Sequence, residues 1–127
     1  MPGNLGLWID HRKAVIVSFT GKIERTVRIL SHMEKHVRYS GGANTTGGED
    51  QRDRRFSGHL RKFYDRVVAR IRDADSILIL GPGEAKGELN ARLGSRALGG
   101  RVVGIQTVDK ITDRQLVARV REHFSQE

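Results

Sequence analysis

Three short segments rich in apolar residues lie within the first thirty positions of the chain. Residues 5–10 form a short apolar run, residues 13–19 read K-A-V-I-V-S-F, and residues 23–30 alternate between two faces. Thr20-Gly21-Lys22 separates the last two segments, and Gly is typical of tight turns because it has no Cβ to restrict the backbone. Segments of period two joined by short turns predict three strands of an antiparallel meander.

The period lengthens to 3.6 between about residues 53 and 73, where the apolar residues share one face of a predicted helix. These residues are Phe56, Leu60, Phe63, Val67 and Ile71. The continuous apolar run 76–80 is typical of a strand buried on both faces, and Gly81-Pro82-Gly83 ends it. A helix over 84–96 and a strand over 101–108 follow.

A capping box marks the start of the last helix. Thr112 and Gln115 are three residues apart, so each side chain can bond the backbone N–H of the other, and Ile111 can pack onto Leu116. The predicted buried stripe of this helix is Leu116, Val120 and Phe124.

The order of three strands, then helix, strand, helix, strand and helix, predicts a mixed sheet of five strands. Alternation of strand and helix in the second half favours parallel strands joined by right-handed crossovers, with helices on both faces of the sheet. A length of 127 residues is typical of one domain, so residues 1–127 are predicted to form a single α/β domain.

A polar segment interrupts this order between residues 31 and 51. It contains Gly41, Gly42, Gly47 and Gly48 and almost no apolar residue, so it has little to bury in a core. Long loops without secondary structure are commonly functional or disordered. We therefore predict a mobile loop over residues 38–51.

Charge gives the first indication of function. Lys and Arg total 23 against 15 Asp and Glu, 17 of the 23 are Arg, and the net charge is +8. A pI near 10.6 favours a nucleic-acid partner, although many proteins are basic for solubility alone. Cys is absent, which excludes disulfides, thiolate metal sites and Cys nucleophiles. No apolar run is long enough for a membrane span or typical of a signal peptide, so we expect a cytoplasmic protein with no membrane partner.

Four segments carry a resemblance that covers nearly the whole chain. They read G-L-W-I-D, R-R-F-S-G-H-L-R-K-F-Y-D-R-V-V, I-L-I-L-G-P-G-E-A-K-G-E-L and V-V-G-I-Q-T-V-D-K. With a glycine-rich loop before a basic helix, the chain resembles the middle domain of eukaryotic and archaeal class-1 peptide-chain release factors and their Pelota-type relatives, and looks like the free-standing bacterial members of that group. The resemblance implies a three-layer α/β/α, ribonuclease-H-like fold of the translational-machinery-component type, with strand order 3-2-1-4-5.

The loop of that family carries Gly-Gly-Gln, in which the glycines act as hinges and the Gln positions water against the peptidyl-tRNA ester. The resemblance implies hinges at the four loop glycines and makes Gln51 the candidate catalytic residue. The motif is altered here, because Gly47-Gly48 is followed by Glu49-Asp50 and Gln51 comes third. The phosphates of ribosomal RNA would repel these two carboxylates, so we predict no robust peptidyl-tRNA hydrolysis.

Residues 52–72 contain eight basic residues against two acidic ones, and the charges cluster by sign instead of alternating. Such a helix face is either an ordinary solvated surface or a contact for an RNA backbone, and the clustering favours contact. We predict contact with rRNA or tRNA at Arg38, Arg52, Arg54, Arg55, Arg61, Lys62 and Arg66.

Other residues suggest alternative sites. Asp10, with Asp53 or Asp65, would resemble the carboxylates of a metal-dependent nuclease, but no further acid follows the strand 76–80. His32 and His36 lack a third metal ligand. Residues 81–86 resemble an anion-binding helix start but do not match a P-loop, and a tight turn is the alternative. We therefore expect no metal and no cofactor.

Three functions are compatible with these patterns. The first is an RNA- or ribosome-binding protein associated with translation. The second is a protein-interaction or adaptor module that keeps the fold without a ribosomal role, and the third is peptidyl-tRNA ester hydrolysis through the loop. Fold does not decide between them, because function depends on the site. The oligomeric state stays open.

Overall fold

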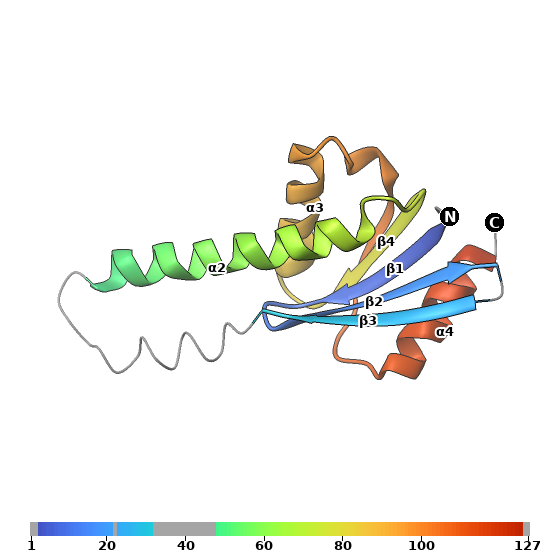
Figure 1. The fold of residues 1–127 in the computed structure, drawn as a ribbon. Coiled ribbons are helices and arrows are strands. Elements are labelled where there is room, and N and C mark those ends of the chain that lie inside the picture. Colours follow the sequence, from blue (N-terminus) through green and yellow to red (C-terminus); the bar gives the residue numbers. More distant parts are fainter. Residues whose placement is uncertain (1–2, 22, 32–47, 126–127) are drawn as a thin grey trace.

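The computed structural model describes residues 3–21, 23–31 and 48–125, with the backbone alone for residues 48–57 (Figure 1). The strands are β1 Asn4–Ile9, β2 Lys13–Thr20, β3 Ile23–Leu30, β4 Ser76–Gly81 and β5 Val102–Thr107. The helices are α2 Gly48–Ile71, α3 Ala85–Ser95 and α4 Asp113–Ser125, with a 3₁₀ turn, η1, at Gly99–Arg101. All predicted strands and helices are present, and the strands lie within one residue of their predicted bounds.

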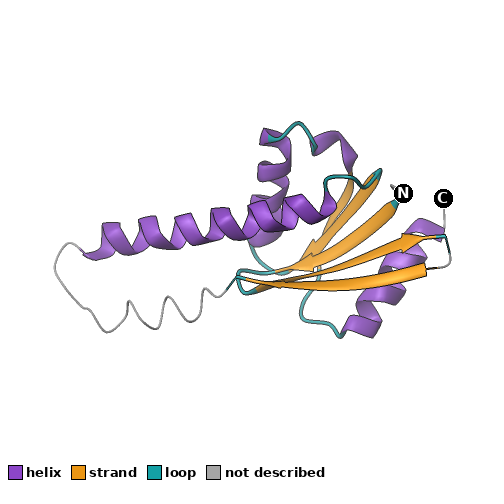
Figure 2. Ribbon diagram, viewed as in Figure 1, coloured by secondary structure: helices purple, strands orange, loops and turns teal. Residues whose placement is uncertain are grey.

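The five strands form one mixed sheet in the order β3-β2-β1-β4-β5, which confirms the predicted strand order and the α/β class. β1 pairs antiparallel with β2, and β2 pairs antiparallel with β3, so the first three strands form the predicted meander. β4 pairs parallel with β1, and β5 pairs parallel with β4. β1 and β4 are central and almost continuously buried, because helices cover both faces of the sheet (Figure 2).

The molecule has three layers. Helices α2 and α3 lie on one face of the sheet, and α4 lies on the other (Figure 1). Phe63 of α2 and Leu89 of α3 belong to the core cluster on the first face. Trp8 of β1 packs with Leu116 and Val120 of α4 on the second face. This arrangement confirms the predicted α/β/α architecture.

Local sequence signals are confirmed at two positions. The Thr112 N–H donates to Gln115 Oε1 at 2.9 Å, and the Gln115 N–H donates to Thr112 Oγ1 at 3.1 Å, so α4 begins with the predicted capping box. Ile111 packs against the cluster that contains Leu116. In the turn before β3, Gly21 takes a φ of +63°, which a residue with a Cβ rarely adopts.

Helix α2 begins at Gly48, five residues before the predicted start. Gly48 and Gln51 therefore lie in its first turn, which corrects the prediction that the loop extends to residue 51. Apolar periodicity begins only at Phe56 and could not mark this start, whereas Glu49 and Asp50 suit the positive end of the helix dipole. The other predicted loop residues lie outside the described part of the chain: Arg38, Gly41, Gly42 and Gly47.

Candidate nucleic-acid interface

Four basic residues are exposed on α2 among those whose side chains are described: Arg61, Lys62, Arg66 and Arg70. They are exposed because the apolar positions of the helix, from Leu60 to Ile71, turn toward the sheet and are buried there. Three of the four, at positions 62, 66 and 70, follow one another at steps of four and share one side of the helix. We call these four residues the basic face of α2.

The positive charge of the basic face is not cancelled locally. Within the described residues, Arg61, Lys62 and Arg70 form no ion pair. Arg66 donates a hydrogen bond to the carbonyl oxygen of Leu30 at 2.8 Å, which joins α2 to the end of β3 and leaves the guanidinium charge uncompensated. Although α2 has 24 residues, neither it nor another helix in the described ranges is long and apolar enough to cross a membrane.

Asp65, which lies among these residues on α2, is engaged with α3 instead. Its Oδ1 accepts from Arg92 Nε at 2.8 Å, its Oδ2 accepts from Arg92 Nη2 at 2.9 Å, and Arg96 Nη2 lies 3.1 Å from Oδ1. The hydrogen bond from Arg92 is the main cause that lowers the pKa of Asp65. The carboxylate of Asp65 therefore links α2 to α3 through ion pairs and does not neutralise the basic face. Sequence reasoning missed this pairing because 27 residues separate Asp65 from Arg92.

Apart from Arg38, which is outside the described part, the remaining predicted contacts lie on the first half of α2, which extends beyond the sheet (Figure 1). Arg52, Arg54 and Arg55 belong to this helical segment, and their side chains are outside the described part. The same holds for Gln51, whose backbone lies in the first helical turn. Arg52, Arg54 and Arg55 thus belong to the same continuous helix as Arg61, Lys62 and Arg66.

Tyr64 is buried in the core, with 5% of its surface exposed. Its hydroxyl donates to Glu88 Oε1, and His11 Nε2 lies 2.9 Å from the same oxygen. Burial, followed by the bond to Glu88, raises the pKa of Tyr64. The hydroxyl therefore stays protonated and links α2 to α3, and the ring does not lie open for a base to stack on it. Sequence reasoning missed this contact because three separate elements supply it.

The carboxylates considered for a nuclease have structural roles. Asp10 Oδ1 accepts from the backbone N–H groups of Arg12 at 2.8 Å and Lys13 at 2.9 Å, so it closes the turn between β1 and β2. Asp65 is held by α3, and the side chain of Asp53 lies outside the described part. Within residues 3–21, 23–31 and 48–125, no three His, Asp or Glu side chains gather as metal ligands. The two candidates His32 and His36 lie outside those ranges.

Residues 81–86 form a tight turn between β4 and α3. Gly81 and Gly83 have φ angles of +155° and +58°, and Lys86 Nζ donates to the carbonyl oxygen of Gly83. The ammonium group of Lys86 is thus directed at its own turn. This contact favours the structural interpretation of the segment over an anion site.

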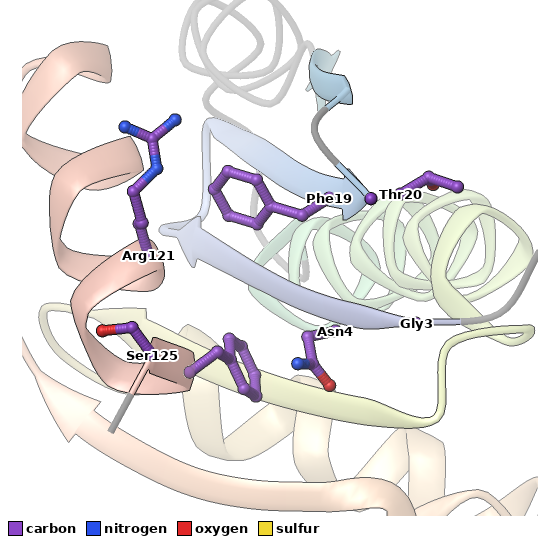
Figure 3. Close-up of a pocket in the computed structure, with 8 residues that line it drawn as sticks. Gly3, Asn4, Phe19, Thr20, Arg121 and Ser125 are labelled. Carbon is purple, nitrogen blue, oxygen red and sulfur yellow. The ribbon is translucent and has the colours of Figure 1, made fainter. Parts of the chain in front are cut away.

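A cavity of about 490 Å³ lies beside α4 and the end of β2 (Figure 3). Phe19, Phe124 and Arg121 are among the residues that line it. Arg121 pairs with Glu24 at 2.8 Å and lies 5.5 Å from the centre of the Phe19 ring, so its charge is compensated. No sequence pattern indicated this cavity, and it shares no lining residue with the basic face of α2.

Several solved structures resemble this fold, three of them as follows. Pelota from Archaeoglobus fulgidus matches with a TM-score of 0.59 and 14% identity, over 94% of this chain and 30% of its own. Pelota from Thermoplasma acidophilum has a TM-score of 0.58 and 18% identity, over 91% and 31%. The archaeal translation termination factor aRF1 has a TM-score of 0.51 and 12% identity, over 96% and 39%. The sequence matches no protein-family model and no curated protein.

These similarities concern one part of each larger protein. The chain spans 30–39% of the length of the three neighbours, and 12–18% identity establishes a common fold without transferring an activity. The structural comparison and the sequence resemblance thus agree on the architecture. This chain has the fold of a Pelota- and release-factor-like domain.

Proposed function

We propose that this chain is an RNA-binding domain that acts on the ribosome during translation, in the cytoplasm, as a relative of the free-standing bacterial type that its sequence resembles. The observation that carries the proposal is the basic face of α2, where Arg61, Lys62 and Arg70 form no ion pair in the described part of the chain. The fold supports it, since a translation termination factor is among the solved structures that share the fold. The RNA partner is rRNA or tRNA.

Phosphate groups match this surface chemically. Arg presents a planar fork of N–H donors that pairs with phosphate through two bonds, and Lys adds a compact charge. Because α2 extends beyond the sheet, an RNA backbone can approach the helix from the side (Figure 2). The net charge of +8 adds an attraction that weakens as salt is added.

Replacing two residues of the basic face tests the proposal. In the double variant Arg61→Gln and Lys62→Gln, ribosome binding should weaken and its salt dependence should become shallower, by a logarithmic slope of about 0.7 to 0.9 for each phosphate that the protein no longer neutralises. Co-sedimentation with ribosomes over a salt series measures both quantities. The matched control is Arg114→Gln with Arg119→Gln on α4, which removes the same charge from exposed positions on the other face. Equal salt-dependence slopes for the two double variants would contradict the assignment of Arg61 and Lys62 as phosphate contacts.

A protein-interaction module is the second candidate, and the edge of the sheet favours it. Val103 and Ile105 on the edge strand β5 are 44% and 41% exposed. Edge strands also offer backbone N–H and C=O groups to another chain. The same sedimentation experiment separates the two functions, because an interaction module with no ribosomal role would not sediment with ribosomes at any salt concentration.

A further inference from the structure

Helix α2 and strand β3 lie close together at one end and separate toward the other. At the C-terminal end of β3, Arg66 bonds the Leu30 carbonyl and Ile29 packs against the core. At the N-terminal end the strand is open to solvent, since Ile23 is 62% exposed and Arg25 is exposed as well. The two elements border a groove of about 210 Å³, which we call the α2–β3 groove.

Two arginines line this groove from different elements. Arg25 lies on the α2 side of β3, because it pairs with Ser18 and shares that side with Val27, and Arg70 belongs to the last turn of α2. Among the described residues, neither arginine forms an ion pair. Asp73 also lines the groove and is not paired with either of them. With two arginines against one aspartate, the groove is net positive.

The sheet side of the groove has both apolar and polar residues, and the polar ones are Asn4, Ser18 and Thr20. Ile16 of β2 and Val27 of β3 face α2 here, opposite each other in the strand register. The groove is smaller than the roughly 300 Å³ at which pockets for drug-sized ligands begin. Two arginines beside a small floor of mixed polarity fit a ligand with a negatively charged group next to a flat ring that has polar edges.

We propose that the α2–β3 groove holds one nucleotide of single-stranded RNA, with the phosphate between Arg25 and Arg70 and the base against Ile16 and Val27. In a duplex the bases are paired and stacked, so only an unpaired base reaches such a floor. Arg70 also belongs to the basic face of α2, so the same strand can continue along that helix. This inference rests on the proposed function and adds to it the form of the RNA and the place where a base is held.

Fluorescence anisotropy of the full chain with a labelled short oligouridylate, and with an RNA duplex of equal charge, tests the inference. The double variant Arg25→Gln and Arg70→Gln should bind the oligouridylate at least about fivefold more weakly than the wild type, the scale of exposed charge contacts. Arg25→Gln alone leaves the basic face of α2 intact, so it should weaken oligouridylate binding and leave the affinity for the duplex unchanged. Arg25→Lys with Arg70→Lys retains the charge and should recover part of the oligouridylate binding.

The control variant Arg114→Gln with Arg119→Gln removes equal charge from α4. A loss no greater than in this control, or an equal loss on oligouridylate and duplex for Arg25→Gln alone, would overturn the groove as a single-strand site and leave the proposed function standing. A wild-type chain that binds neither RNA nor ribosomes would overturn the proposed function and the groove together. If circular dichroism shows the double variant unfolded, Arg25→Gln alone on the edge strand carries the same test.

Discussion

Gly81 ends strand β4 at a point where the backbones of β4 and β1 nearly touch. Its φ is +155°, and a Cβ there would lie 2.2 Å from the carbonyl oxygen of Ile9. Because the oxygen belongs to the backbone of the central strand β1, it cannot move aside without disturbing the sheet. We expect Gly81→Ala to lower the free energy of unfolding by about 3 kcal/mol, measured by urea denaturation.

Gly87 provides the matched control for this substitution. It lies on α3, where a Cβ would meet nothing within 4 Å. Gly87→Ala should leave stability unchanged or raise it by up to about 1 kcal/mol, because Ala favours the helix. Similar losses for both substitutions would show that the contact with Ile9 is not the cause.

The ion pairs of Asp65 make stability depend on pH. The hydrogen bond from Arg92, with further attraction from Arg96, lowers the pKa of Asp65 below its ordinary value of 3.8 in the folded state. A group whose pKa is lower in the folded state stabilises the fold at pH values above its ordinary pKa. This stabilisation is lost as the pH falls through the pKa of the folded state. Asp65→Asn should therefore lower Tm by a few degrees at neutral pH, with the gap narrowing below about pH 4.

Thermal unfolding of the wild type and of Asp65→Asn across this pH range checks the prediction. Asp75→Asn serves as the comparison, because Asp75 is exposed and forms no ion pair in the described part of the chain. A gap between wild type and Asp65→Asn that stays constant from neutral to acid pH would contradict the role given to Asp65.

At the scale of elements, helices and strands follow local patterns closely. The alternation in β3 and the capping box of α4 are short-range signals, and the structure confirms both. The start of α2 was wrong by five residues, because the apolar periodicity used to locate it is absent before Phe56. The sequence before Phe56 is polar, so it offers no apolar periodicity to mark the helix.

The capping box of α4 can be tested directly. Thr112 Oγ1 accepts from the Gln115 N–H at 3.1 Å, which satisfies a donor that the helix itself leaves unpaired. Thr112→Ala should lower the free energy of unfolding by about 1 kcal/mol, read from the midpoint of urea denaturation. Thr112→Ser keeps the hydroxyl and should retain most of the stability; a loss as large as that of the alanine variant would argue against capping.

At the scale of the whole molecule, the order of the strands decides which charged side chains lie next to an oppositely charged partner. The central position of β1 and β4 buries the apolar strands, and α4 compensates charges of β3 through Arg28–Asp113 and Glu24–Arg121. The opposite side of β3, toward α2, leaves Arg25 without an ion pair in the described ranges. The two sides of β3 therefore differ in ion pairing within the described residues.

The absence of an intact Gly-Gly-Gln motif predicts the behaviour of the whole chain toward peptidyl-tRNA. Glu49 and Asp50 follow Gly48 in the first turn of α2, and Gln51 lies in the same turn. The carboxylates would be repelled by the phosphates around the ester. We expect release of labelled peptide from stalled ribosomes at the background rate, for the wild type and for Gln51→Ala alike. Faster release that Gln51→Ala abolishes would restore the hydrolytic function.

The sequence by itself determined the elements, the α/β class and the excess of arginine on one helix, because these depend on short-range periodicity and on composition. The resemblance to release-factor middle domains added the correct strand order. Tertiary structure alone decided which arginines remain unpaired, because the carboxylate of Asp65 meets Arg92 only after α2 and α3 pack on the same face. It also decided the α2–β3 groove, because the residues that line it come from segments that are far apart in the chain.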